Sequence, residues 1–501
     1  MKTHDARLLA KRKRRIARRL RPRNFKATER PVFRATSPRY EVADRAVAVR
    51  AGGIGAVHAM AKSLGLVAAI DGALPLLKVH LPYHESDHVL AQSYNLLAGH
   101  TCLEDLELLR RDEGFTHMLG APRIPDPTTA GDFLRRFREQ DVRALMDAIN
   151  VVRARVWERQ PAEARREAVI DVDGTLAPTC GEKKEGMSLS YNGIWGYHPL
   201  LVSLSNFREP LFVVNRPGNV PSHAGAAEWI DRAIDLCAPH FGSVLVRGDT
   251  DFSLTANFDR WTGRGVRFVF GYDAKQELVQ RAEAIPEADW KPLPRAARTP
   301  ATGERGKRDN ARERVVVEKG YTNLRLEGES YAEIAYRPTK CARDVRMVIV
   351  RKDIAVERGG AWLFNDWRFF LYVTNDPALS AEEVVAHARA RCDQENLIDQ
   401  LKNGVHATRM PAHDLVSNWA YMVIASLAWT LKAWMALTLP RKADRADVVR
   451  MEFKRFLHAM MLVPCQVVRA GRRVVLRLLA YTDHARLLFR SMEASARLRF
   501  T

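Results

Sequence analysis

Two apolar segments that end in carboxylates constrain the fold of this chain most strongly. AVIDVDGTL at 168–176 and SVLVRGDTDF at 243–252 are each typical of a buried strand with acidic residues at its carboxyl end. Residues two apart on a strand share a face, so each segment presents an acidic pair to one side of a sheet. The two pairs are Asp171 with Asp173 and Asp249 with Asp251. The sequence therefore predicts an α/β fold in which carboxylates from two strands converge at one sheet edge.

A third acidic residue lies in a segment with helical character, ARARCDQENLIDQLKNG at 388–404. Arg391, Glu395 and Lys402 are spaced by four and seven residues, which places them on one face of an α-helix. A solvated face with an Arg–Glu pair is the simple interpretation. The alternative is a helix that brings a metal ligand and two phosphate-binding cations to a strand of nucleic acid.

The three acids Asp173, Asp249 and Glu395 form a chemically coherent set if they meet. Three hard oxygen ligands with open positions suit Mg²⁺, with Mn²⁺ as a substitute, better than zinc. Two such ions about 4 Å apart activate a water or a 3′-hydroxyl for in-line displacement at phosphorus. Taken singly, each acidic pair also fits carboxylates that cap helices or bind arginine.

The charge of the chain indicates the class of its partner. The net charge is +20 and the pI is near 9.9, which favours a polyanion such as nucleic acid. The basic N-terminal stretch that would lie on phosphates contains Lys11, Arg12, Lys13, Arg14 and Arg15. Six scattered cysteines without a CxxC pair fit reduced thiols in the cytoplasm. The apolar run at 419–430 is too short for a membrane span, and no secretory signal is expected.

Several stretches carry a resemblance to a known family. They are DVDGTLAPTCG, SYNGIWGYHPLLVSL, NRPGN followed by His223, VRGDTDF, and RARCDQENLIDQLKNG. Together they resemble a bacterial insertion-sequence transposase of the DDE type, over roughly residues 165–270 and 365–410. The resemblance implies a ribonuclease-H-like catalytic core, a mixed five-stranded sheet with flanking helices. It also implies a strand-rich insertion between the second and third acids.

The same resemblance assigns the site residues. Asp173, before Gly and Thr, matches the first acid, with Asp171 as second choice; Asp249, after Arg-Gly, matches the second. Glu395 matches the third acid, within a pattern that includes Arg391 and Lys402 as phosphate-binding cations. The tyrosine of that pattern is replaced by Ala388, and Asp251 stands where relatives often carry glycine.

Further candidates lie outside the acidic pattern. Arg216 and Asn219, in a Gly/Pro-containing turn, are candidates for contact with phosphate or DNA. Relatives with a strand-rich insertion can use an aromatic residue there to hold a flipped base. Trp290 and Trp362 are therefore possible base-stacking residues, with burial in the core as the simpler interpretation.

The chain divides into six regions by composition and pattern. They are a basic flexible arm at 1–40, a helical DNA-binding region at 41–163, the first part of the core at 164–274, the β-rich insertion at 275–365, the second part of the core at 366–410, and a helical C-terminal region at 411–501.

The expected function is DNA transposition by two-metal-ion catalysis. The enzyme would cleave phosphodiester bonds at transposon-end inverted repeats and join the 3′-hydroxyl ends to target DNA. The expected partners are double-stranded transposon ends and target DNA, and a second protomer in the synaptic complex. The expected location is the bacterial cytoplasm, at the nucleoid when DNA is bound.

Two other functions fit parts of the sequence. DVDGTL also resembles the first motif of haloacid-dehalogenase-like phosphatases, in which Asp171 would be the nucleophile and Asp173 the acid/base. That fold gives no role to the helix with Glu395 and no reason for the positive charge. A catalytically inactive DNA-binding protein descended from a transposase is the third possibility.

Overall fold

A computed structural model of the chain describes residues 3–21, 47–294, 317–320, 322–359, 361–470 and 473–497. The KRDNARER stretch at 307–314 and the part of the basic arm from 22 to 40 lie outside these residues. The chain forms two compact units, one made of 1–133 with 434–501 and the other of 134–433. The N-terminal helical region and the C-terminal region, separate in the sequence-based division, thus share one unit.

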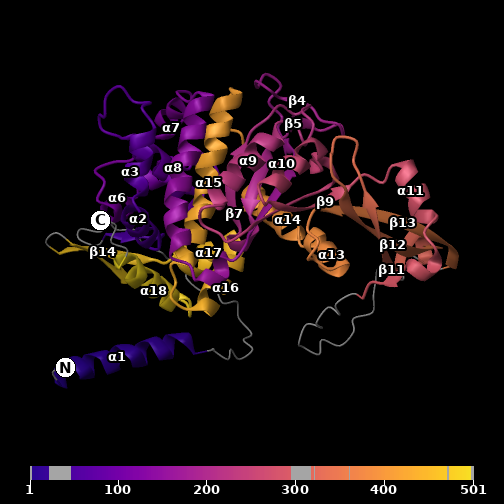
Figure 1. Ribbon diagram of the computed structural model, residues 1–501. Coiled ribbons are helices and arrows are strands. Elements are labelled where there is room, and N and C mark those ends of the chain that lie inside the picture. The colour runs from indigo at the N-terminus through magenta and orange to yellow at the C-terminus, as the bar shows by residue number, and fades with distance from the viewer. Residues whose placement is uncertain are drawn as a thin grey trace. The chain divides into compact units, whose positions relative to one another are not determined.

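The second unit is built around one large mixed sheet (Figure 1). Among the described residues it has nine strands. In spatial order they are β10 (Lys291–Pro292), β11 (Thr322–Tyr336), β12 (Val345–Arg358), β13 (Ala361–Thr374), β9 (Arg267–Tyr272), β8 (Val244–Gly248), β2 (Ala168–Gly174), β6 (Leu200–Leu204) and β7 (Glu209–Val214).

The five strands β7, β6, β2, β8 and β9 form the expected mixed core. β2 runs antiparallel to β6, which pairs with β7, and parallel to β8, which in turn runs parallel to β9. Central strands covered on both faces are apolar throughout, and β8 is buried along its whole length. The predicted α/β class and five-stranded core are confirmed, and both segments that end in aspartates contain neighbouring strands. The expectation that Asp249 and Asp251 share a strand face is wrong, because β8 ends at Gly248 and Thr250–Phe252 form a 3-10 turn.

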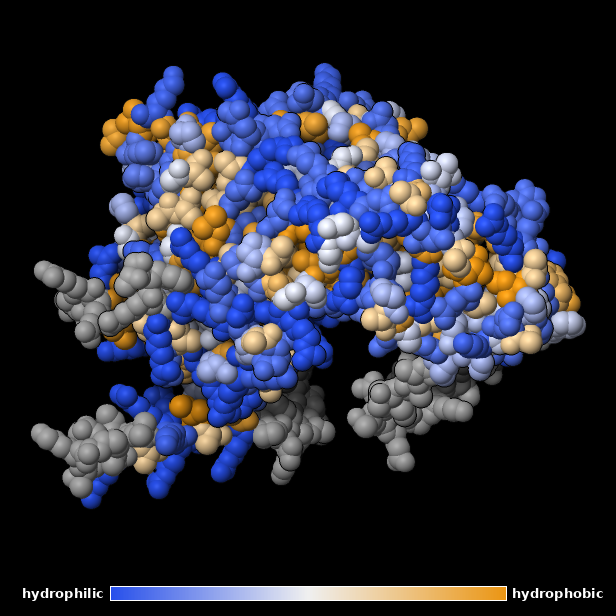
Figure 2. All heavy atoms as spheres, in the orientation of Figure 1, coloured by the Kyte–Doolittle hydropathy of each residue, from blue (hydrophilic) through white to orange (hydrophobic). Residues whose placement is uncertain are grey.

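The β-rich insertion extends this sheet and does not form a separate one. β13 pairs with β9 of the core through Leu371–Thr374 and then runs outward as the third strand of β11–β12–β13. The two sequence segments LRLEGES and YAEIAYRP are one strand, β11, with a register shift between Leu326 and Gly328. Figure 2 shows hydrophobic side chains gathered over these strands, where Trp362, Phe364 and Trp367 are exposed.

Helices cover the sheet and carry the third acid. Those of the second unit are α8 (Glu139–Glu158), α9 (Ala226–Cys237), α10 (Phe258–Gly263), α11 (Gln276–Glu283), α13 (Ala381–Arg389), α14 (Cys392–Asp399) and the start of α15 (Leu415–Leu437). α9 begins after Gly225, whose φ is +69°. The preceding residues form a turn in which the carbonyls of Ser222 and Ala224 accept hydrogen bonds from Arg216.

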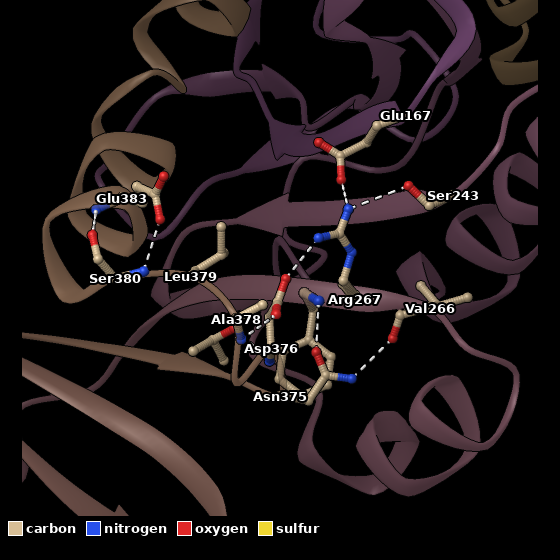
Figure 3. A network of polar contacts seen from close by, with 12 residues as sticks. Glu167, Ser243, Val266, Arg267, Asn375, Asp376, Ala378, Leu379, Ser380 and Glu383 are labelled. Atoms are coloured by element: carbon tan, nitrogen blue, oxygen red, sulfur yellow. Dashed lines mark hydrogen bonds and ion pairs between the residues drawn. The ribbon is translucent and has the colours of Figure 1, made fainter.

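The turn from β13 into α13 is held by a polar network (Figure 3). Arg267 contacts Asp376 at 2.7 Å and also contacts Glu167, while Asn375 accepts a hydrogen bond from the backbone N–H of Phe268. A capping box between Ser380 and Glu383 then starts α13, as the sequence predicts. Because Val384 and Val385 of α13 pack on the sheet, this network fixes where the following helix, α14, begins.

The first unit is mainly helical but contains a small sheet. Its helices are α1 (Thr3–Leu20), α2 (Ile54–Ser63), α3 (Leu66–Ala73), α4 (Glu85–Leu97), α5 (Leu106–Arg111), α6 (Glu113–Leu119), most of α7 (Pro127–Leu134), α16 (Lys442–Arg450), α17 (Phe453–Phe456) and α18 (Ala485–Ala496). The C-terminal region is not helical throughout, because β14 (Cys465–Ala470) pairs with both β15 (Arg473–Leu478) and β1 (Ala48–Val49).

The longest apolar helix is buried. α15 is long and apolar enough to pass a test for a membrane span, but its apolar window is 100% buried inside the protein. The expected interpretation of 419–430 as a buried helix agrees with this burial. At the other end of the chain, α1 is helical over the described part of the basic arm, and Lys11 to Arg15 are exposed on it.

Candidate functional site

The first two acids of the predicted set lie side by side at the ends of parallel strands. Val172 of β2 pairs with Gly248 of β8, and the next residue along each chain is Asp173 and Asp249. A side chain on Gly248 would meet Phe252 and Phe270, so only glycine lets β8 end this close to its neighbours. The register therefore brings the two carboxylates to one sheet edge, as the strand patterns predict.

Arg391 lies between these carboxylates. Its Nη2 is 3.6 Å from Oδ2 of Asp173 and 3.7 Å from Oδ2 of Asp249. The side chains are 17% exposed for Arg391, 16% for Asp173 and 40% for Asp249. Both contacts are longer than a charge-assisted hydrogen bond, and Nε of Arg391 is buried without a hydrogen-bond partner among the described residues. The guanidinium is thus ion-paired with two carboxylates at long distance and hydrogen-bonded to neither.

Glu395 reaches the same neighbourhood from α14. It is exposed, and its negative charge contributes to raising the pKa of Asp173. The helix is not the continuous one expected over 388–404. It is interrupted around Ala390 and Arg391, between α13 and α14, and passes into a π-helical turn at Gln400–Gly404.

Lys402 lies in that π-helical turn. Burial lowers the pKa of its ammonium group, and the charges of Asp399 and Asp173 raise it. π-Helical turns are rare and occur often at functional sites, because they shift the side chains that follow on the helix face. All five residues of the predicted set, from Asp173 to Lys402, therefore act electrostatically on one small region.

Burial dominates the electrostatics of the acids, and Arg391 opposes it more than any neighbouring carboxylate adds to it. Burial raises the pKa of Asp173 to about 7; Arg391 opposes the shift, and the charges of Asp249 and Glu395 add to it. Burial also raises the pKa of Asp249, with Arg391 again opposing and Asp251 adding. Carboxylates so placed favour a further cation, and hard oxygen donors suit Mg²⁺.

The ligand atoms of the three acids are not closely grouped. Among the described residues, the one group of three or more possible ligand atoms within 4.8 Å of one another is His80, His84 and Glu85, in the first unit. Asp173, Asp249 and Glu395 thus form a more open arrangement than a closed set of ligands. Divalent ions that keep several water ligands accept such an arrangement.

Asp171 has a different position from Asp173. It is 1% exposed and forms a bidentate ion pair with Arg247, at 2.7 Å from Nε and 2.8 Å from Nη2. Arg247 also donates to the carbonyl of His387 at 3.2 Å, which ties β8 to the end of α13. No role for Arg247 is evident from the family resemblance. An arginine inside an otherwise apolar strand requires a buried acidic partner, which is a signal that a pair exists but does not say with which residue.

His198 and the backbone of Asp251 make contacts that hold the loops around Asp173 and Asp249. His198 is 3% exposed, with Nδ1 at 2.8 Å from the carbonyl oxygen of Val220, and its Nε2 lies against Gly174, where a Cβ would be only 2.9 Å away. The backbone N–H of Asp251 donates to Oδ1 of Asp249 at 3.0 Å, while the Asp251 side chain is exposed.

Arg216 does not have the expected exposure. It is 8% exposed; Nε donates to the carbonyl of His198, and Nη1 donates to those of Ser222 and Ala224. These bonds make its guanidinium a structural clamp for the turn, while Nη2 is buried without a hydrogen-bond partner among the described residues. Asn219, three residues later, is exposed.

The two tryptophans proposed for base stacking differ in exposure. Trp290 is 9% exposed and covered by the guanidinium of Arg351, 4.4 Å from its ring centroid, so the base-stacking prediction is wrong for it. Trp362 is 62% exposed, near the tip of β12 and β13. From Leu371, where β13 joins the core, it is roughly 30 Å along the strand.

Comparisons with known proteins follow the same direction. The family model described as transposase DDE domain group 1 matches residues 46–500. A search of curated proteins gives no match. A solved structure with weak similarity is the cryo-EM structure of the piggyBac transposase synaptic complex with hairpin DNA. It is 11% identical, with a TM-score of 0.33, over 82% of this chain and 84% of that chain. Likeness this weak supports no transfer of residue roles.

Proposed function

Because the chain belongs to the DDE transposases of domain group 1, we propose that it cleaves phosphodiester bonds at transposon ends and joins the freed 3′-hydroxyls to target DNA. One observation carries the proposal at the level of residues. Asp173 and Asp249 end adjacent parallel strands and share Arg391, and the charge of Glu395 acts on Asp173. Two acids at one sheet edge and a third on helix α14 suit the binding of metal ions beside a DNA backbone.

Asp173, Asp249 and Glu395 would hold divalent metal, expected as two Mg²⁺ ions with Mn²⁺ as a substitute. When bound, the ions would activate the attacking water or 3′-hydroxyl and stabilise the leaving oxygen. Arg391 and Lys402 would orient non-bridging phosphate oxygens, because each is a cation near the acids with capacity left for an anion. A cut-and-paste route and a synaptic homodimer belong to the same proposal.

The basic surface would supply affinity for double-stranded DNA. Lys11 to Arg15 are exposed on α1, and the chain carries a net charge of +20. Contacts of this kind release counterions, so DNA binding should weaken steeply as salt rises. In a bacterial cell these contacts would place the protein on the nucleoid.

The rival phosphatase function loses its nucleophile. Asp171 would have to attack a phosphate, but it is buried and both of its oxygens are bound by Arg247. A nucleophilic carboxylate needs access to its substrate. An inactive descendant of a transposase remains a distinct outcome of the test below.

A cleavage assay tests the proposal. Purified full-length protein is incubated with Mg²⁺ and DNA that carries the terminal inverted repeats of its own element. The expected products are breaks at the ends for wild type and none for Glu395→Gln, with end binding retained by both. Cleavage by Glu395→Gln at the wild-type rate would overturn the assignment of the third acid. End binding without cleavage by wild type would show an inactive descendant.

A further inference from the structure

A hairpin beside the acids exposes a cluster of apolar side chains. The tip of β4 (Ser188–Leu189) and β5 (Trp195–Tyr197), at the top of Figure 1, is here called the 189–195 tip. Its exposed side chains are Tyr191 at 85%, Trp195 at 55%, Leu189 at 47% and Ile194 at 38%. Single exposed apolar residues are common on proteins, but a cluster with two aromatic rings usually marks a binding surface.

The 189–195 tip is a rigid, hydrogen-bonded turn. The backbone N–H of Ser190 donates to the carbonyl of Ile194 at 2.9 Å, and the Ser190 hydroxyl accepts from the N–H of Ile194 at 3.0 Å. Gly193 has a φ of +80°, which the turn requires and which side chains disfavour. A turn built in this way presents its aromatic rings with little conformational entropy left to lose on binding.

The base of the hairpin is anchored to the loop that surrounds the site. A Cβ on Gly218 would be 2.2 Å from the carbonyl oxygen of Gly196 and 2.4 Å from that of Ser188, so the two backbones are in direct contact. The Tyr197 hydroxyl donates to the carbonyl of Glu185 at 2.9 Å. Tyr197 itself is fully buried, unlike the aromatic residues of the tip.

The tip is close to the acids. The ring centroid of Tyr191 is 6.4 Å from that of His198, and Nε2 of His198 lies against Gly174, the residue after Asp173. The charges of Asp251 and Lys402 both act on His198. The tip is therefore next to the place where a phosphodiester would be bound if Asp173 is a metal ligand.

We propose that Tyr191 and Trp195 bind an unpaired nucleobase of the DNA strand whose phosphate lies at the acids. This inference rests on the proposed function. Asp173 is only 16% exposed, so a phosphodiester that approaches it has to leave the regular duplex surface, and opening the duplex there exposes base faces. Aromatic side chains bind such faces by stacking, whatever the base. A basic chain with exposed aromatic rings beside the acids matches that ligand in charge and shape.

The experiment compares two DNA probes of one arbitrary sequence, without divalent metal. One is a fully paired duplex; the other is a fork with about six unpaired thymines on each arm and one 2-aminopurine at the junction. Wild-type protein is expected to bind the fork more tightly and to quench the 2-aminopurine. The double variant Tyr191→Ala/Trp195→Ala should lose about tenfold in fork affinity and most of the quenching, with duplex affinity unchanged.

Trp362→Ala is the matched control, because Trp362 is exposed to a similar degree but lies near the tip of the β11–β13 arm. It should leave fork affinity and quenching unchanged. The proposal is overturned if wild type does not prefer the fork, if the double variant keeps the preference, or if Trp362→Ala removes it instead. Thermal denaturation confirms that the variants fold.

The assay is independent of cleavage, so its failure differs from failure of the proposed function. A tip-dependent fork preference in a protein that never cuts DNA would support the tip and contradict the transposition chemistry. If the double variant changes the oligomeric state while DNA binding stays intact, the tip contacts protein and the proposal fails.

Discussion

Two aspartates on strand β2, only two residues apart, form different kinds of ion pair with arginine. Asp171 is buried, and its two oxygens are bound by Arg247 at 2.7 and 2.8 Å. Asp173 is partly exposed and shares Arg391 with Asp249, at 3.6 and 3.7 Å. The first pair is saturated and can only hold the sheet together. The second cluster has more negative charge than its arginine balances, which is the condition for binding another cation.

The largest expected effect is a loss of cleavage activity in a variant that still folds. Asp173→Asn removes a proposed metal ligand, so cleavage of end DNA should fall by about a thousandfold or more, a barrier increase of about 4 kcal/mol. Gel assays of cleavage measure this, and circular dichroism should show an unchanged fold. If Asp173→Asn still cleaves like wild type, Asp173 is not a metal ligand needed for cleavage.

The opposite result is expected at Asp171. Asp171→Ala leaves the guanidinium of Arg247 buried without its carboxylate, and breaking a buried ion pair in this way costs about 3–5 kcal/mol of stability. Urea denaturation of the second unit measures the loss. The double variant Asp171→Ala/Arg247→Met should recover part of it, because it removes the stranded charge as well. A stable single variant would show that the pair is not a structural element.

Strand patterning predicted that acidic residues such as Asp173 and Asp249 follow apolar strands, and it indicated the α/β class. The five-stranded core and the choice among the acids were implied by the resemblance to DDE transposases. Strand patterning did not distinguish the roles of Asp171 and Asp173, because partners such as Arg247 come from another strand through register. The exposure of Trp362, the burial of Trp290 and the break before α14 also depend on tertiary packing, which single-segment patterns do not contain.

The third prediction uses pH to test whether burial raises the pKa of Asp173 in the folded protein. The carboxyl of Asp173 has a pKa near 3.8 in the unfolded chain and about 7 in the folded protein. Between these pH values the folded state binds the extra proton, so stability should fall as the pH rises. With a chelator present, the free energy of unfolding of the metal-free protein should fall by about 2–4 kcal/mol between about pH 5 and pH 8. Urea denaturation at each pH measures this change.

Matched variants assign that pH dependence. Asp173→Asn should reduce the slope and be more stable than wild type at high pH, and added Mg²⁺ should also reduce the slope for wild type. Some slope should remain in Asp173→Asn, because burial also raises the pKa of Asp249 and of Asp171. Asp171→Asn is the comparison variant, because it leaves Asp173 in place and should keep a downward slope. A flat curve for metal-free wild type would contradict the raised pKa of Asp173.

The smallest expected effect compares the two arginines directly. Lysine keeps the positive charge of arginine but lacks its planar, bidentate guanidinium. Arg391→Lys should therefore reduce stability little, because the contacts of Arg391 with its carboxylates are long. Arg247→Lys should reduce stability more, because both contacts of Arg247 with Asp171 are short. For Arg391→Lys we expect about a tenfold fall in cleavage, or about 1.4 kcal/mol, with urea stability unchanged. For Arg247→Lys we expect a loss of about 1–3 kcal/mol in stability, because one oxygen of Asp171 stays buried without its donor. Equal losses of stability in both variants would mean that Arg391, like Arg247, is a structural residue, and its proposed contact with phosphate would have no support.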